Sequence, residues 1–125
     1  MLNKQQIATI KDYFSTKPVI AVYLYGSQAK NSETEESDID LAILVDEKSK
    51  MAEDIQLVVM SELSIILDKK VEVQVLNICS TSFSYRVISE GIILVSHNES
   101  VRIAFEEEIM KHYFDLLPFN EEYNK

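Results

Sequence analysis

Apolar positions along the chain form runs, alternations and helical spacings, and each of these patterns predicts a different element. Val19 to Tyr25 is an unbroken apolar run of seven residues, as expected for a central strand buried on both faces. Ile39 to Val45 predicts a second, mostly apolar strand. Val71 to Val75 alternates strictly, which is typical of a strand with two different faces. Ile92 to Val95 predicts a fourth short strand.

Helical spacing fills the stretches around these strands. Ile7, Ile10 and Phe14 share one helical face behind Asn3, a residue type that caps helix N-termini, and Pro18 interrupts this helix. A short helix is expected from Thr81 to Glu90, with Gly91 just beyond its end. Residues 51–68 predict an amphipathic helix whose apolar side comprises Ile55, Val58, Val59 and Ile66.

The C-terminal stretch predicts one more helix, from near Asn98 or Ser100 to Leu117. Proline cannot continue a helical hydrogen-bond ladder, so Pro118 is expected to end it. The apolar positions of this helix recur every four residues, at Val101, Phe105, Ile109, Tyr113 and Leu117.

The order of these elements predicts the fold class. Polar residues 27–37, expected to form a short helical turn and an exposed loop, separate the first two strands. The whole pattern indicates an α/β or α+β domain with a small mixed sheet of about four strands flanked by helices. A chain of 125 residues, 46% hydrophobic, fits one compact domain spanning residues 1–125.

Composition excludes some classes of function. The formal net charge is −9, from 12 Lys and Arg against 21 Asp and Glu, whereas nucleic-acid binders usually carry a basic face. Direct nucleic-acid binding is therefore not expected. The longest apolar run is far too short to cross a membrane, no signal-like segment opens the chain, and Cys79 has no partner for a disulfide. These features point to a cytoplasmic protein.

Candidate chemistry begins with Asp38 and Asp40. Residues two apart on a strand project from the same face, so both carboxylates can reach one divalent cation or bridge two. An isolated Asp-x-Asp pair can equally cap a strand end in solvent. Gly26 and Ser27 end the preceding strand, and a glycine turn with a serine hydroxyl makes a phosphate-binding concavity. Lys30 can add a positive charge to it.

Glu72 is the third candidate carboxylate. It shares one face of its strand with Gln74, opposite Val71, Val73 and Val75. If this strand lies beside the Asp38–Asp40 strand, the three carboxylates meet. An exposed face of an edge strand is the simpler explanation of Glu72 taken alone.

In combination these parts resemble a known family. The stretches Tyr25-Gly26-Ser27-Gln28-Ala29 and Ser37-Asp38-Ile39-Asp40-Leu41-Ala42-Ile43, with a later carboxylate on another strand, are similar to the DNA polymerase β-like nucleotidyltransferase superfamily, and within it to the minimal nucleotidyltransferase (MNT) family. The chain departs from the family pattern at Gln28 and Lys30, where arginine is common, at Asn31, where glycine is common, and at Glu72, where aspartate is usual.

The resemblance implies a polymerase β-like fold and an enzyme. In the implied scheme Asp38 and Asp40 bridge two Mg²⁺ ions, Glu72 ligates the catalytic ion, and Gly26 and Ser27 orient the triphosphate of ATP. MNT proteins are usually paired with a HEPN-domain protein. The implied function is therefore an antitoxin that transfers AMP to a tyrosine of a HEPN ribonuclease toxin, with residues 98–125 as the segment for partner docking.

Two other functions stay open at this point. The chain could neutralise a HEPN partner by contact alone, as a binding module with a degraded site. It could instead be a small-molecule nucleotidyltransferase of the aminoglycoside-modifying kind, although no acceptor-binding domain is visible in the sequence. Nucleotide preference, acceptor and stoichiometry have no signature in the sequence.

Overall fold

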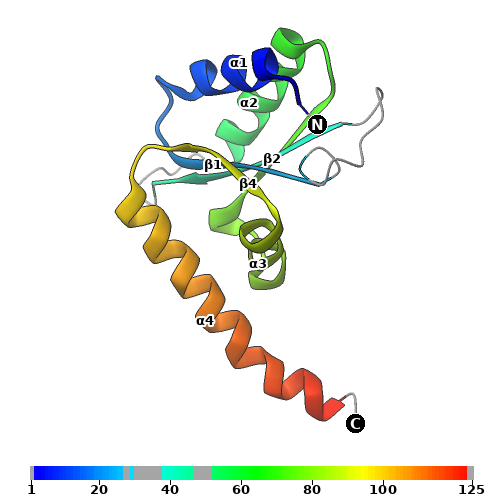
Figure 1. Ribbon diagram of the computed structural model, residues 1–125, viewed down its shortest axis with the longest axis vertical. Helices are drawn as coiled ribbons and strands as arrows, with labels where there is room; N and C mark the ends of the chain where they lie inside the picture. The colour runs from blue at the N-terminus through cyan, green and yellow to red at the C-terminus, as the bar shows by residue number, and fades with distance from the viewer. Residues whose placement is uncertain (1, 27–28, 30–37, 47–51, 124–125) are drawn as a thin grey trace.

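A four-stranded mixed sheet with helices on both faces forms the body of the protein in the computed structural model (Figure 1). The structure describes residues 2–26, 29, 38–46 and 52–123. The elements in chain order are α1 (Lys4–Phe14), β1 (Val19–Tyr25), β2 (Ile39–Val45), α2 (Ala52–Leu67), β3 (Val71–Val75), the 3₁₀ turn η2 (Leu76–Ile78), α3 (Thr81–Glu90), β4 (Ile92–Ser96) and α4 (Glu99–Tyr123). The predicted fold class and all four predicted strands are confirmed.

The strands lie in the order β3-β2-β1-β4. β1 runs antiparallel to both of its neighbours, whereas β2 and β3 are parallel and joined through α2. The apolar side chains of β1 and β2 point to both faces, because each face is covered. On one face, α1 and α2 pack on Val22, Leu24 and Leu41; on the other, α3 and α4 pack on Tyr23 and Ala42.

The first helix begins as the sequence indicates. Asn3 Oδ1 accepts a hydrogen bond from the Gln6 backbone N–H at 2.7 Å, and Gln6 Oε1 accepts one from the Asn3 N–H at 3.0 Å. This reciprocal pair satisfies two N–H groups that a helix start otherwise leaves unbonded. Behind the cap, Ile10 and Phe14 are fully buried.

The buried side of α2 differs from the prediction. Val59 is buried as expected, but Val58 and Ile66 are each 51% exposed, and Leu63 takes the place of Ile66 in the core. Leu57 and Ile65 are exposed as well. The helix carries apolar residues almost all round, so its periodicity does not determine which side faces the sheet.

The prediction that Pro118 ends the last helix was wrong, since α4 continues to Tyr123. Proline fixes a backbone angle close to the helical value and removes one N–H, so its cost near a helix end is limited to one hydrogen bond and local crowding. Beyond the sheet, α4 extends past α3 and carries the C-terminus away from the body (Figure 1).

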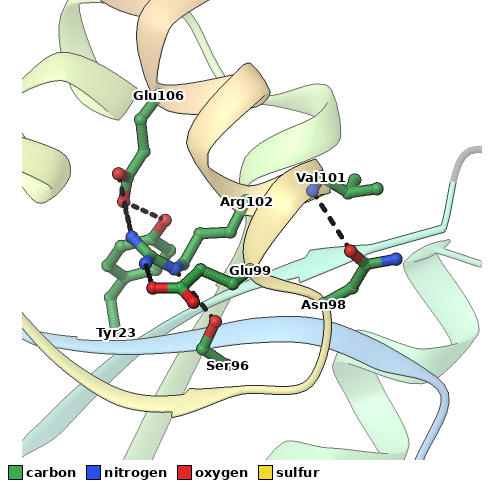
Figure 2. A network of polar contacts seen from close by, with 7 residues as sticks. All are labelled: Tyr23, Ser96, Asn98, Glu99, Val101, Arg102 and Glu106. Atoms are coloured by element: carbon green, nitrogen blue, oxygen red, sulfur yellow. Dashed lines mark hydrogen bonds and ion pairs between the residues drawn. The ribbon is translucent and has the colours of Figure 1, made fainter.

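A partly buried polar cluster fastens the first part of α4 to the sheet (Figure 2). The Tyr23 hydroxyl, on β1, donates to Glu106 Oε2 at 2.8 Å. Arg102 donates to both oxygens of Glu106, at 3.0 and 3.1 Å, and through Nε to Ser96 Oγ at 3.0 Å. Because Tyr23 is only 1% exposed, its hydroxyl needs this partner. We call these residues the Tyr23–Glu106–Arg102 clamp.

Candidate functional site

Three side chains from three adjacent strands form one row across the sheet. The row consists of Tyr25, Asp40 and Glu72, and we call it the acidic row. Tyr25 on β1 is the pairing partner of Asp40 on β2, and Asp40 is the parallel pairing partner of Glu72 on β3. Residues paired directly across strands project to the same face, so the three side chains belong to the face that α3 and α4 partly cover. The expected adjacency of the Glu72 strand and the Asp40 strand is confirmed.

Gly26 ends β1 in a conformation that explains its identity. Its φ is +74°, in the left-handed region that residues with a Cβ avoid. A Cβ at this position would overlap Asp40 Oδ2 and lie 3.3 Å from Asp40 Cγ. The glycine therefore allows the backbone turn and the Asp40 carboxylate to lie against each other.

The carboxylates of Asp38 and Glu72 share one ion-pair partner, the Lys70 ammonium group. Lys70 Nζ lies 3.2 Å from Glu72 Oε1 and 3.9 Å from Asp38 Oδ2. The Lys70 side chain is 67% exposed, so these pairs are accessible to water and contribute little to stability. Lys70 thus partly neutralises the acidic row from the side of β3.

Negative charge accumulates around Asp40. Burial raises the pKa of its carboxyl group, the nearby carboxylates of Asp38 and Glu72 raise it further, and Lys70 lowers it. Burial, followed by the charge of Asp40, raises the pKa of Tyr25 to about 12. Burial is the larger cause of both shifts, and the neighbouring carboxylates add to it; a bound cation would relieve this repulsion between negative charges.

The first half of α3 lies against the Tyr25 end of the row. The Phe83 ring meets the Tyr25 ring edge-on, with centroids 5.5 Å apart. Arg86 is exposed, and its guanidinium carbon lies 5.9 Å from the centroid of the Phe83 ring. Gly91 lets the end of this helix approach β1, since a Cβ there would lie 3.0 Å from the Leu24 carbonyl oxygen.

The oxygen donors suit a hard divalent cation such as Mg²⁺, which prefers carboxylates, water and phosphate oxygens. The repulsion that Asp38 and Glu72 exert on a charged Asp40 agrees with such an ion, because a cation would offset it. Among the described residues, however, no three acidic, histidine or cysteine side chains converge as a ready metal cage, and Glu72 is turned toward Lys70. The backbone therefore brings Asp38, Asp40 and Glu72 together, while the Glu72 side chain would have to release Lys70 to join them.

Two predicted site residues, Ser27 and Lys30, lie outside the described residues. Three residues at or near the site, Tyr25, Lys70 and Arg86, were not predicted as members of it. A signal existed for Lys70, because it stands two residues before Glu72 and shares its face. Nothing in the sequence placed Arg86 beside Tyr25.

The two histidines and the single cysteine of the sequence either make structural contacts or are exposed. His97 Nε2 lies 2.9 Å from the Phe14 carbonyl oxygen and ties the end of β4 to the end of α1. His112 is exposed and lies 3.6 Å from Glu108. Cys79, half-buried, donates its S–H to the Val75 carbonyl oxygen at 3.1 Å.

A groove of roughly 810 Å³ lies between α4 and the opposite end of the sheet. Its apolar lining comes from β1, β2, η2 and the inner side of α4, and its polar lining includes Asp46 and Glu108. The apolar members are Ile20, Leu44, Val45, Ile78, Val101, Ala104, Phe105 and Ile109.

Comparisons with known proteins agree with this geometry. The family model described as polymerase beta nucleotidyltransferase matches residues 8–100. A chain from a crystal structure of a toxin–antitoxin with AMP-PNP superposes with a TM-score of 0.74 and 23% identity, covering 98% of this chain and 95% of that one. A chain from a MntA–HepT complex with two aspartates replaced by glutamate gives a TM-score of 0.74 and 20% identity over the same shares.

A third structure contains tri-AMPylated Shewanella oneidensis HEPN toxin with MNT antitoxin; a chain from it superposes with a TM-score of 0.73 and 19% identity, covering 98% of this chain and 95% of that one. No curated protein sequence matches the chain significantly. Within the described part of the chain, no helix is both long and apolar enough to cross a membrane.

Proposed function

Because this chain belongs to the polymerase beta nucleotidyltransferase family, we propose that it transfers AMP from ATP to a tyrosine of a HEPN-domain toxin and thereby acts as an antitoxin. The observation that carries the proposal is the in-register pairing of Asp40 with Glu72 beside the Gly26 turn. This arrangement gathers carboxylates where a backbone turn can receive phosphates.

The chain's own residues have distinct roles in this proposal. Asp38 and Asp40 would hold two Mg²⁺ ions, and Glu72 would become a ligand on releasing Lys70. Mg²⁺, when bound, acidifies an attacking hydroxyl and stabilises charge on the phosphates. Gly26 and Ser27 orient the triphosphate through the turn, and Lys30 adds positive charge. The raised pKa of Asp40 means that ion binding displaces any proton there.

Similar proteins support the choice of donor and acceptor. One neighbour was crystallised with AMP-PNP, an ATP analogue, and another with a HEPN toxin carrying AMP. The two aspartates replaced in the MntA–HepT complex have the same spacing as Asp38 and Asp40. A cytoplasmic location agrees with an ATP-dependent reaction of this kind.

We propose that the HEPN partner docks along residues 98–125, with part of its surface in the groove beside α4. The groove offers an apolar floor together with the largely exposed carboxylate of Glu108. A basic amphipathic segment of the partner matches both features, whereas a second copy of this chain, with its net charge of −9, would be repelled. Glu108→Lys should weaken the complex, and Lys4→Glu on α1 is a distant control.

The transfer reaction can be tested with the purified chain, a HEPN partner, Mg²⁺ and ATP. We expect the partner to gain the mass of one or more AMP groups. Asp38→Asn and Asp40→Asn should abolish that gain, and Glu72→Gln should reduce it severely. Asp12→Asn, at an exposed position of α1, should leave it unchanged. Normal transfer by the Asp40→Asn variant would refute the site assignment.

One observation favours a second function. Glu72 stands where the MNT family usually has aspartate, and a metal ligand displaced by about an ångström can be costly in rate. In that case the chain neutralises its partner by contact alone. Neutralisation that survives the combined Asp38→Ala and Asp40→Ala changes, without AMP on the partner, would identify a binding module.

A further inference from the structure

The acidic row has a positive group at each end in the described part of the chain. Lys70 lies at the β3 end and is already paired with Glu72 and Asp38. Arg86 lies at the β1 end, on α3. It is one of only two arginines in the sequence, and the other, Arg102, is 11% exposed and held in the Tyr23–Glu106–Arg102 clamp.

A chain of ring contacts fixes the place of Arg86. Its guanidinium lies over the Phe83 ring at 5.9 Å, Phe83 meets the Tyr25 ring at 5.5 Å, and Tyr25 pairs with Asp40. The positive charge of Arg86 also lowers the pKa of Tyr25, while Asp40 and Glu72 raise it. The Tyr25 hydroxyl therefore lies within the electrostatic reach of the carboxylates and of Arg86.

The helix that carries Arg86 is held firmly. Ser80 Oγ accepts from the Phe83 N–H at 3.2 Å and caps α3 at its start. At its other end, the Gly91 N–H donates to the Val87 carbonyl oxygen at 2.8 Å, close against β1. Val87, on the side of α3 that faces the sheet, is buried. Arg86 is thus an exposed cation on a fixed support, which lowers the entropy cost of binding a ligand there.

We propose that Arg86 and the aromatic wall of Tyr25 and Phe83 form a phosphate subsite that binds the terminal phosphates of the nucleoside triphosphate. The N–H donors of a guanidinium lie in its own plane, where they can bind phosphate oxygens in pairs. The metal-binding carboxylates and the phosphate-binding cation then lie on opposite sides of Tyr25. This inference rests on the proposed nucleotidyl transfer.

The proposed subsite predicts which ligands lose binding affinity when Arg86 is replaced. A triphosphate reaches both the carboxylates and Arg86, whereas AMP lacks the terminal phosphates. With Mg²⁺ present, Arg86→Gln should weaken AMP-PNP binding roughly tenfold to a hundredfold, the range for losing hydrogen bonds to a charged group. AMP binding should be unchanged. Arg86→Lys should restore part of the loss, because it keeps the charge without the paired donors.

Isothermal titration of the full chain with AMP-PNP, AMP and inorganic tripolyphosphate provides the measurement. Lys11→Gln removes an exposed positive charge from α1 on the other face of the sheet and should bind every ligand as the unchanged chain does. Thermal unfolding checks that Arg86→Gln leaves the fold intact.

The possible outcomes separate the subsite from the reaction. Equal AMP-PNP affinity in Arg86→Gln and the unchanged chain, with transfer intact, would overturn the subsite and leave the proposed function standing. Equal loss of AMP and AMP-PNP binding would also overturn it, since the terminal phosphates would then not be what Arg86 contacts. If the unchanged chain binds no AMP-PNP, both proposals fail.

Discussion

Replacing Gly26 with alanine perturbs the point where the β1 turn meets Asp40. The left-handed backbone, at φ +74°, costs alanine about 1 kcal/mol or slightly more. The new Cβ would also overlap Asp40 Oδ2, so the carboxylate must move aside by about an ångström, and a misplacement of that size can slow catalysis on the order of a hundredfold. We therefore expect Gly26→Ala to lower AMP transfer far more than it lowers stability.

The two contributions can be separated by a double-mutant cycle. Asp40→Ala keeps the Cβ, which lies at 3.4 Å from the added methyl group in ordinary contact, and removes the carboxylate that overlaps it. Urea unfolding should show that Gly26→Ala costs less free energy in the Asp40→Ala background, where only the backbone strain is left. An equal cost in both backgrounds, or transfer at the normal rate by Gly26→Ala, would refute the reasoning.

Three further predictions concern stability and pH. Tyr23→Phe should lower the free energy of unfolding by about 1–2 kcal/mol, because it removes a partly buried hydrogen bond to the Glu106 carboxylate; urea unfolding measures this, and Tyr13→Phe, which removes an exposed hydrogen bond to Glu62, should cost less. Ser84→Ala should be neutral or stabilising by up to about 1 kcal/mol, since the buried Ser84 hydroxyl has no partner among the described residues; clear destabilisation would show that the hydroxyl is satisfied. The folded chain binds the Asp40 proton more tightly than the unfolded chain does, because the pKa of Asp40 is raised on folding. The stability that this proton contributes is present below the ordinary pKa of 3.8 and is lost as pH rises through the higher folded value. Without divalent cations, Asp40→Asn should therefore have a higher melting temperature than the unchanged chain at pH 7, and this difference should shrink toward pH 4.

The strands were predictable because their patterns have one physical meaning. Val19 to Tyr25 is apolar on both faces, and the structure covers both faces of β1 with helices. Val71 to Val75 alternates, and its valines are buried while Glu72 is half-exposed. Each strand has the bounds that its pattern predicts, to within one residue at the end of β4.

The orientation of α2 was not predictable to the same degree. Leu63 and Ile66 are equally apolar, and only the position of the sheet decides that Leu63 is buried and Ile66 half-exposed. The continuation of α4 past Pro118 has a similar cause, since a local rule about proline competes with a helix already formed behind it.

The placement of the three candidate carboxylates on neighbouring strands was predictable, whereas the contacts of their side chains were not. Spacing places Asp38 and Asp40 on one face, and the sheet pairs Glu72 with Asp40, as was expected if the two strands were neighbours. The ion pairs of Lys70 and the position of Arg86 depend on how β3 and α3 pack, which involves contacts between residues far apart in the chain.

The parallel register of β2 and β3 also limits how such a site can change. Along β3 an acid keeps its face only when it moves by two residues, a step of about 6.6 Å. Exchanging Glu72 and Gln74 would therefore move the carboxylate one full step, to the level of Ala42. A one-residue insertion in β3 would turn it into the core under α2. Only side-chain length can move the carboxylate by less than this step. Glutamate in place of aspartate is therefore the smallest change in carboxylate position that the sheet allows.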